Sequence, residues 1–234
     1  MKKVVLVVAM LGAAHAVAGD LSQIGTLTQS QFLKLSSDLG AVTAYKGLTP
    51  ATPLGISGFD VGVEVTQTSI ENTALFRQAG AGDLSNLYVP KIHLTKGLPF
   101  GFDIGAFVSK VSGVNGSLFG AEARYAILHD GLTTPAFGVR LSGSKLTGVG
   151  NAKLSTVAVD AMLSKKLALV TPYIGAGSVR VTSRADVGGL REERFDKSRV
   201  FIGLNVNIVL TNLALEAEKM GDNTSLSAKL GIRF

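Results

Sequence analysis

The chain has 234 residues, no cysteine or tryptophan, and a formal net charge of +6, to which Lys2 and Lys3 contribute. The lack of cysteine excludes disulfides and thiolate chemistry. The other basic residues are scattered rather than clustered, which argues against a nucleic-acid partner. A mean hydropathy of +0.34 with 46% hydrophobic residues is high for a soluble secreted domain.

The first residues have the pattern of a secretory leader. Lys2 and Lys3 precede an apolar run over residues 4–14, and the small residues of 14–18 form two overlapping cleavage motifs. We expect a signal peptide over residues 1–18, cleaved after Ala18. The alternative is an uncleaved anchor, but the apolar run is shorter than the about 20 residues that a spanning helix needs.

Residues 19–55 differ from the rest of the chain. Thr28 and Gln31 have the spacing of a capping box, and a helix of about three turns is predicted after them, with Gly40 able to close it. Its apolar face is formed by Phe32, Leu35 and Leu39. An extended piece over 41–46 and a turn over 47–53 follow. We expect residues 19–55 to be a periplasmic segment or a lumen plug, with an additional hairpin over 40–55 as the alternative.

From Ile56 onward, segments that alternate apolar and polar residues are separated by turn signals. The pattern predicts ten strands, or twelve if residues 40–55 add a hairpin. The ten segments are 56–68, 87–97, 101–111, 117–128, 134–144, 153–165, 170–182, 198–209, 212–219 and 224–234. The predicted fold is therefore all-β, a single antiparallel transmembrane β-barrel over residues 56–234 with a short N-terminal helix.

The loop lengths support an outer-membrane location. If Phe234 is periplasmic, the two longest connections, residues 69–86 and 183–197, both fall outside the cell. Long outer loops and short periplasmic turns are typical of bacterial outer-membrane barrels.

The charged residues predict which face of each strand points inward. Asp60 and Glu64 share one face of the first strand, and charges are unfavourable on a lipid-facing surface. The same reasoning leaves residues 171–181 ambiguous, but it assigns seven acids and six bases to the lumen, with His93 as a further base when protonated. The set is Asp60, Glu64, Lys91, His93, Asp103, Glu122, Arg124, Arg140, Asp160, Arg180, Glu216, Glu218, Lys229 and Arg233.

This nearly balanced set predicts a filled or very narrow lumen. Charges removed from water are expensive unless they pair, so we expect these side chains to form a network. Barrels of eight strands are just filled by side chains, and open channels appear at about sixteen strands. A general pore is therefore disfavoured.

A search for catalytic and binding motifs finds little. His93 and His129 are the histidines outside the leader, and their separation argues against a metal site. No nucleophile elbow or phosphate loop is present, so no catalytic residue, metal ligand or cofactor is predicted. The charged loop 183–197 is interpreted as a solvated tip, with lipopolysaccharide contact through its arginines as the alternative.

Several phrases of the chain resemble an uncharacterised family of proteobacterial outer-membrane β-barrels, a domain of unknown function. The resemblance spans most of the chain after the leader. It is carried by residues 53–65, 89–101, 120–125, 171–177 and 213–234. It implies the barrel fold and an outer-membrane location, and it supplies no functional residues.

The last strand also resembles the signal that the barrel-assembly machinery reads. Leu230, Ile232 and Phe234 would form this signal, with Phe234 as the anchoring aromatic residue. The expected partners are therefore this machinery, outer-membrane lipids and lipopolysaccharide. The expected function is a non-enzymatic barrel with a structural or surface role, or a narrow conduit. A transporter of small or hydrophobic solutes is the alternative, and a lipid-modifying enzyme is less favoured.

Overall fold

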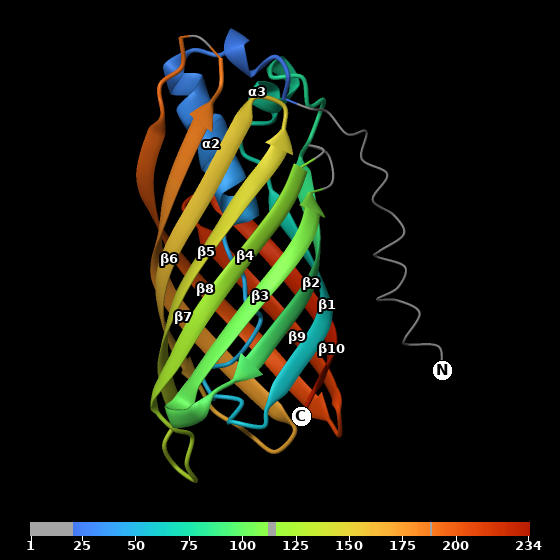
Figure 1. Ribbon diagram of the computed structural model, residues 1–234, viewed down its shortest axis with the longest axis vertical. Helices are drawn as coiled ribbons and strands as arrows, with labels where there is room; N and C mark the ends of the chain where they lie inside the picture. Colours follow the sequence, from blue (N-terminus) through green and yellow to red (C-terminus); the bar gives the residue numbers. More distant parts are fainter. Residues whose placement is uncertain (1–20, 112–115, 188) are drawn as a thin grey trace, which may run out of the picture.

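A computed structural model describes residues 21–111, 116–187 and 189–234. The predicted signal peptide over residues 1–18 lies outside the described residues. Ten antiparallel strands each pair with the next, and β1 pairs with β10 to close a barrel (Figure 1). The strands are β1 (Phe59–Ser69), β2 (Asn86–Gly97), β3 (Phe102–Val111), β4 (Gly116–Leu128), β5 (Ala136–Val149), β6 (Ala152–Ser164), β7 (Val170–Ala185), β8 (Glu193–Ile208), β9 (Thr211–Met220) and β10 (Asn223–Arg233). No described helix is long and apolar enough to cross a membrane.

Alternation of side chains gives each strand an inner and an outer face. In β6, Val157 and Val159 are exposed on the outside, while Ala158 and Asp160, which alternate with them, are buried inside. Successive side chains of a strand point to opposite faces, so every strand of a closed barrel sends one row to the lumen. This confirms the prediction of a ten-strand antiparallel barrel, and most strand ends lie within a few residues of the predicted ones.

The loops differ more from the predictions. The two ends of the barrel are named as follows. The loop end is the end where the chain passes from β1 to β2, and the turn end is the end where β1 begins. The connection predicted over 183–197 is much shorter, because β7 continues to Ala185 and β8 begins at Glu193. The connection after β1 contains the unpredicted helix α3 (Thr73–Gln78), whose Phe76 is buried.

The N-terminal helix is longer than predicted. A short 3₁₀ turn η1 (Ile24–Thr26) precedes helix α2 (Gln29–Thr43), which starts with the expected capping box of Thr28 and Gln31. The expectation that Gly40 ends this helix is wrong. Gly40 lies within α2, not at its end. Glycine suits this position because a side chain would clash with the barrel wall: a Cβ atom would lie 2.7 Å from Cγ2 of Val181.

No strand forms between residues 40 and 55, so the twelve-strand alternative is wrong. Instead, α2 lies inside the barrel at the loop end, and the chain after it descends through the lumen to the start of β1 (Figure 1). Consistent with this position, α2 contacts β1, β5, β6, β7 and β10, which surround the lumen. The 3₁₀ turn η2 (Pro99–Gly101) joins β2 to β3 at the turn end.

The interior of the barrel is filled by this N-terminal chain. Every residue from Asp38 to Ala51 is buried. At the loop end, the apolar face of α2 joins Leu21, Ile24 and Phe76 in one hydrophobic cluster with the inner wall. A ten-strand barrel encloses more space than its own inward side chains fill, and the chain before β1 occupies that additional space.

Candidate functional site: the lumen and its N-terminal segment

The barrel wall holds the N-terminal chain mainly by its backbone. We call residues 44–58 the lumen segment. Arg199 Nη1 donates to the carbonyl of Tyr45 at 2.7 Å, and Arg124 Nη1 donates to that of Pro50 at 2.9 Å. At the turn end, the segment is the donor and the wall is the acceptor, since the backbone N–H of Leu54 donates to Asp103 at 3.1 Å. Because these bonds join charged wall groups to main-chain atoms, each is expected to be stronger than a bond between neutral groups.

Arg199 lies at the centre of the largest group of lumen charges. Its Nε and Nη2 atoms donate to the two oxygens of Asp160 at 2.7 and 2.5 Å, and its Nη1 atom lies 3.5 Å from Glu218. Arg140 Nε donates to Asp160 at 2.8 Å. Lys46 of the lumen segment approaches Glu218 at 3.2 Å. These five side chains are almost fully buried, so the network compensates charges that have lost their hydration.

A second group surrounds His93. Its Nε2 atom lies 2.7 Å from the hydroxyl of Tyr45, and its Nδ1 atom lies 3.3 Å from Glu64. Lys91 pairs with the other oxygen of Glu64 at 3.0 Å and donates to the carbonyl of Lys46. The carboxylate, imidazole and hydroxyl resemble a proton relay in order, but His93 is fully buried in the interior of the barrel.

Two further groups lie towards the turn end. Arg124 Nη2 contacts Asp103 at 2.9 Å, and its Nε atom lies 3.4 Å from Glu122. Lys229 contacts Asp60 at 2.8 Å, and Arg233 donates to the same carboxylate oxygen through Nε at 2.7 Å. The lumen charges therefore form a chain of pairs from the middle of the barrel to its turn end.

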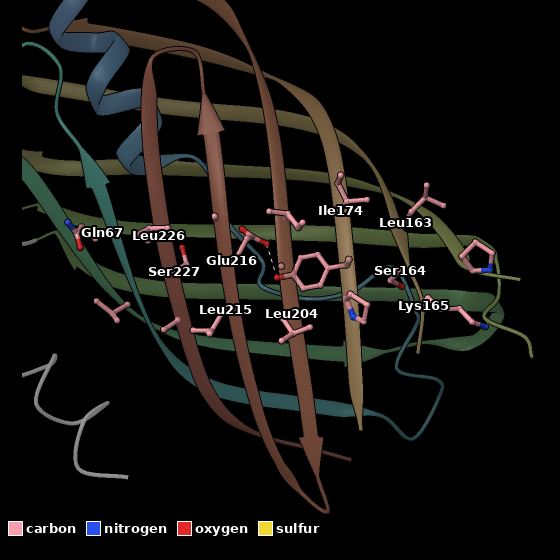
Figure 2. Close-up of a pocket in the computed structure, with 18 of the residues that line it drawn as sticks. Gln67, Leu163, Ser164, Lys165, Ile174, Leu204, Leu215, Glu216, Leu226 and Ser227 are labelled. Carbon is pink, nitrogen blue, oxygen red and sulfur yellow. Dashed lines mark hydrogen bonds between the residues drawn. The ribbon is translucent and has the colours of Figure 1, made fainter. Parts of the chain in front are cut away.

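Glu216 is held differently from the other lumen acids. It accepts a hydrogen bond of 2.9 Å from the hydroxyl of Tyr173 (Figure 2). A Cβ atom on Gly203 would lie 2.1 Å from the Tyr173 ring, so this position requires glycine. The second oxygen of Glu216 has no hydrogen-bond partner among the described residues.

The structure places thirteen of the fourteen predicted lumen side chains inside the barrel and contradicts the prediction for Arg180. Arg180 is exposed on the outer face and pairs with Asp196. The inward row of β7 is the one with Gly175 and Gly177, because Gly177 leaves room for Asp160: a Cβ atom there would lie 2.2 Å from its Oδ1 atom. Glycine carries no polarity signal, so the charge pattern of residues 171–181 could not reveal this.

Three charged residues of the interior were not predicted. Arg199 could have been found, because it alternates with Val200 and extends the inward row of β8 beyond Gly203. Lys46 and Asp38 lie before the first strand, where strand alternation supplies no signal. Asp38 accepts hydrogen bonds from the side chain and backbone of Asn72 and from Asn223.

Asp38 joins the loop end to α2, so its removal is expected to loosen the outer mouth. Asp38→Ala would leave Asn223 and Asn72 without their charged acceptor. We expect the free energy of unfolding to fall by about 1.5 to 3 kcal/mol, the typical contribution of a hydrogen bond to a charged group. Urea titration in detergent micelles measures the change. Asp83→Ala, which removes an exposed carboxylate beside Arg77 at the same end, is the control, and an equal effect of both substitutions would contradict the assigned role.

The residues proposed as an assembly signal lie on the outer face of β10. Leu230 is half-buried, while Ile232 and Phe234 are exposed. Phe234 stacks on Phe59 across the β1–β10 seam with ring centroids 5.9 Å apart, and the backbones of the two residues exchange hydrogen bonds. They contribute to barrel closure, while their recognition during assembly stays a prediction.

A large depression lies on the outer wall. It has a volume of about 1,090 Å³ and is lined mainly by outward apolar side chains of β6 to β10, β1 and β2. Leu163, Ile174, Leu204, Leu215 and Leu226 are among them (Figure 2). Such a surface suits hydrocarbon chains, and the charged residues that also line it are Lys165 and Glu216. Among the described residues, no cluster of three or more histidine, aspartate or glutamate side chains is placed to hold a metal ion.

No protein-family model matches the chain. No curated protein matches it either. The predicted membership of a proteobacterial barrel family therefore stays a prediction.

Several solved outer-membrane barrels have a similar architecture. The N-terminal β-barrel domain of Pseudomonas aeruginosa OprF is 10% identical, with 77% of this chain and 99% of that chain covered and a TM-score of 0.36. Neisserial surface protein A is 12% identical, with 76% and 96% covered and a TM-score of 0.33. Ail of Yersinia pestis is 12% identical, with 76% and 97% covered and a TM-score of 0.31. At this level of similarity, the fold assignment rests on the strand pairing of the chain itself.

Proposed function

We propose that this protein is a non-enzymatic barrel of the bacterial outer membrane whose lumen is closed by its own N-terminal chain, and that its role is structural or at the cell surface. The observation that carries the proposal is the lumen segment. Charged wall residues hold its backbone along the barrel, and the residues from Asp38 to Ala51 are all buried. A lumen filled in this way leaves no path for a general pore.

The outer surface supports the membrane location. The outward row of β8 from Val200 to Ile208 is apolar. It measures about 27 Å along the strand at about 3.4 Å per residue, and a tilt of about 40° reduces its height to about 21 Å. At the turn end, Phe102 stacks on Tyr125 with centroids 4.5 Å apart. Aromatic residues at the edge of an apolar band are typical of membrane barrels.

A narrow conduit for small solutes is the second candidate. The contacts of the lumen segment favour this candidate, because they are mainly hydrogen bonds and ion pairs that water could replace. In this case the segment would move to open the lumen. The closed barrel and the conduit differ in whether the N-terminal chain must move.

A disulfide between α2 and the wall can separate the two candidates, because the chain has no native cysteine. The ideal Cβ position of Gly40 lies 3.5 Å from Cβ of Val181, within the range that a disulfide needs. Replacing valine by cysteine also removes the methyl group that a side chain at position 40 would meet. We therefore expect Gly40→Cys/Val181→Cys to form a bridge that locks α2 in place.

Single-channel recording in planar bilayers then gives the test. For a closed barrel, we expect no conductance steps from the wild type, and none from the locked variant before or after reduction. A conduit would show steps in the wild type that the oxidised variant lacks and that dithiothreitol restores. Val181→Cys alone is the matched control. Steady conductance that the lock does not alter would overturn the filled lumen.

A further inference from the structure

The outer wall carries a group of exposed basic residues towards the loop end. We call Lys145, Lys153, Arg180, Arg184 and Arg194 the cationic patch. They come from β5, β6, β7 and β8, which are consecutive neighbours in the barrel, and each side chain lies on the outward face. All five are exposed. They therefore form one continuous surface on the wall.

The register brings like charges together within this patch. Lys153 lies directly opposite Arg184. Lys145 lies opposite Ser155, which makes Lys153 its diagonal neighbour. Like charges placed opposite one another destabilise a sheet, so this arrangement is unfavourable unless anions neutralise it.

The chain supplies too few carboxylates to neutralise the patch. Lys153 and Arg184 share one carboxylate, that of Asp186, whose Oδ1 atom lies 3.3 Å from Arg184 Nε. Arg180 pairs with Asp196, and Arg194 pairs with Glu192. In the part of the chain that the structure describes, no carboxylate pairs with Lys145. The patch therefore keeps an excess of positive charge.

The cationic patch lies at the edge of the apolar band. Arg180 is paired across the strands with Val157, and Lys145 is paired with Phe119, both of which are exposed apolar residues of the outer face. In a membrane, this edge coincides with the headgroups of the lipids that cover the band. The opposite edge, at the turn end, carries stacked aromatic residues instead.

We propose that the cationic patch binds the phosphate groups of lipopolysaccharide in the outer leaflet. The proposal rests on the outer-membrane location proposed above, with the loop end outside. Guanidinium groups bind phosphate through two parallel hydrogen bonds, and ammonium groups add charge. Lys153 and Arg184 form the centre of the site, because a phosphate could compensate the charge that Asp186 alone leaves in excess.

The test compares lipid A with its dephosphorylated form, using the full-length folded protein in phosphatidylcholine vesicles. We expect lipid A to bind more tightly than the dephosphorylated lipid. For Lys153→Gln/Arg184→Gln, we expect about tenfold weaker binding of lipid A or more, because two cations near an anionic lipid surface are neutralised. The matched control is Lys34→Gln/Arg77→Gln, which removes one lysine and one arginine exposed at the same end but away from the outer wall.

The outcomes distinguish the patch from a set of solvated ion pairs. Equal binding of the two lipids, or an equal effect of the two double variants, would overturn the proposal. Equal binding of phosphatidylglycerol and lipid A would show a general attraction to anionic lipid and overturn the assignment to lipopolysaccharide. If the wild type fails to insert into any vesicle, as shown by unchanged gel migration on heating, the membrane location itself is contradicted.

Discussion

Arg199→Met is expected to lower the free energy of unfolding by about 3 to 5 kcal/mol, the usual cost of removing one partner from a buried ion pair. Arg199 is fully buried and contacts Asp160, Glu218 and the carbonyl of Tyr45. Methionine keeps most of the volume of the side chain, so the loss reports charge and hydrogen bonds rather than a cavity. Arg140 and Lys46 would remain as partners of the two carboxylates, but the carbonyl of Tyr45 would lose its donor.

Urea titration in lipid vesicles measures this loss. Circular dichroism follows the unfolding, because the chain has no tryptophan for a fluorescence signal. Arg180→Met is the control, since it removes an arginine from an exposed pair with Asp196 on the neighbouring strand. We expect no measurable change from it, because solvent screens exposed pairs. Similar effects of the two substitutions would contradict a structural role for the lumen network.

The barrel was predictable because its determinants are local. Alternation of apolar and polar residues needs only a few neighbours to be read, and it indicated ten strands and the inward row of nine of them. The register follows from the same pattern, since a slip by one residue would turn Asp60 and Glu64 towards lipid. The exception was β7, where the inward row is marked by Gly175 and Gly177, whose function is to make space.

The filling of the lumen could not be derived in the same way. Thr28 and Gln31 predict where α2 starts, but its position inside the barrel depends on pairs of residues far apart in the chain. Tyr45 meets His93, and Lys46 meets Glu218. A balanced set of charges predicted that the lumen would be filled, and it could not indicate that the N-terminal chain shares in the pairing.

Lys46 shows how the N-terminal chain and the wall depend on one another. Its ammonium group donates to the carbonyl of Ala41 at 2.7 Å, near the end of α2, and approaches Glu218 of β9. It thus joins the last turn of the helix to the wall at the point where the chain becomes extended. The path of the lumen segment is therefore set by side chains from both partners, which makes the segment a part of the folded barrel.

Deletion of residues 21–52 is expected to convert a closed barrel into a conducting one. The ladder of strand pairs from β1 to β10 does not include these residues, so closure of the barrel does not require them. Their removal would leave Lys91, Arg124 and Arg199 facing an interior that water can enter, and hydration would replace the lost carbonyl contacts. We expect discrete conductance steps in planar bilayers where the full chain shows none.

Two controls connect the conductance with the missing segment. Heat-modifiable migration on gels shows whether the shortened chain still forms a barrel, and only the folded fraction enters the comparison. A synthetic peptide of residues 21–52, added to the folded variant, should reduce the conductance, because the wall residues that bind the backbone of the lumen segment are still present. A peptide with the same composition in scrambled order should block less well, since the pairing of Lys46 with Glu218 and of Tyr45 with His93 depends on position. A folded but insulating deletion variant would show that the wall alone fills the lumen, and the closing role of the N-terminal chain would then be wrong.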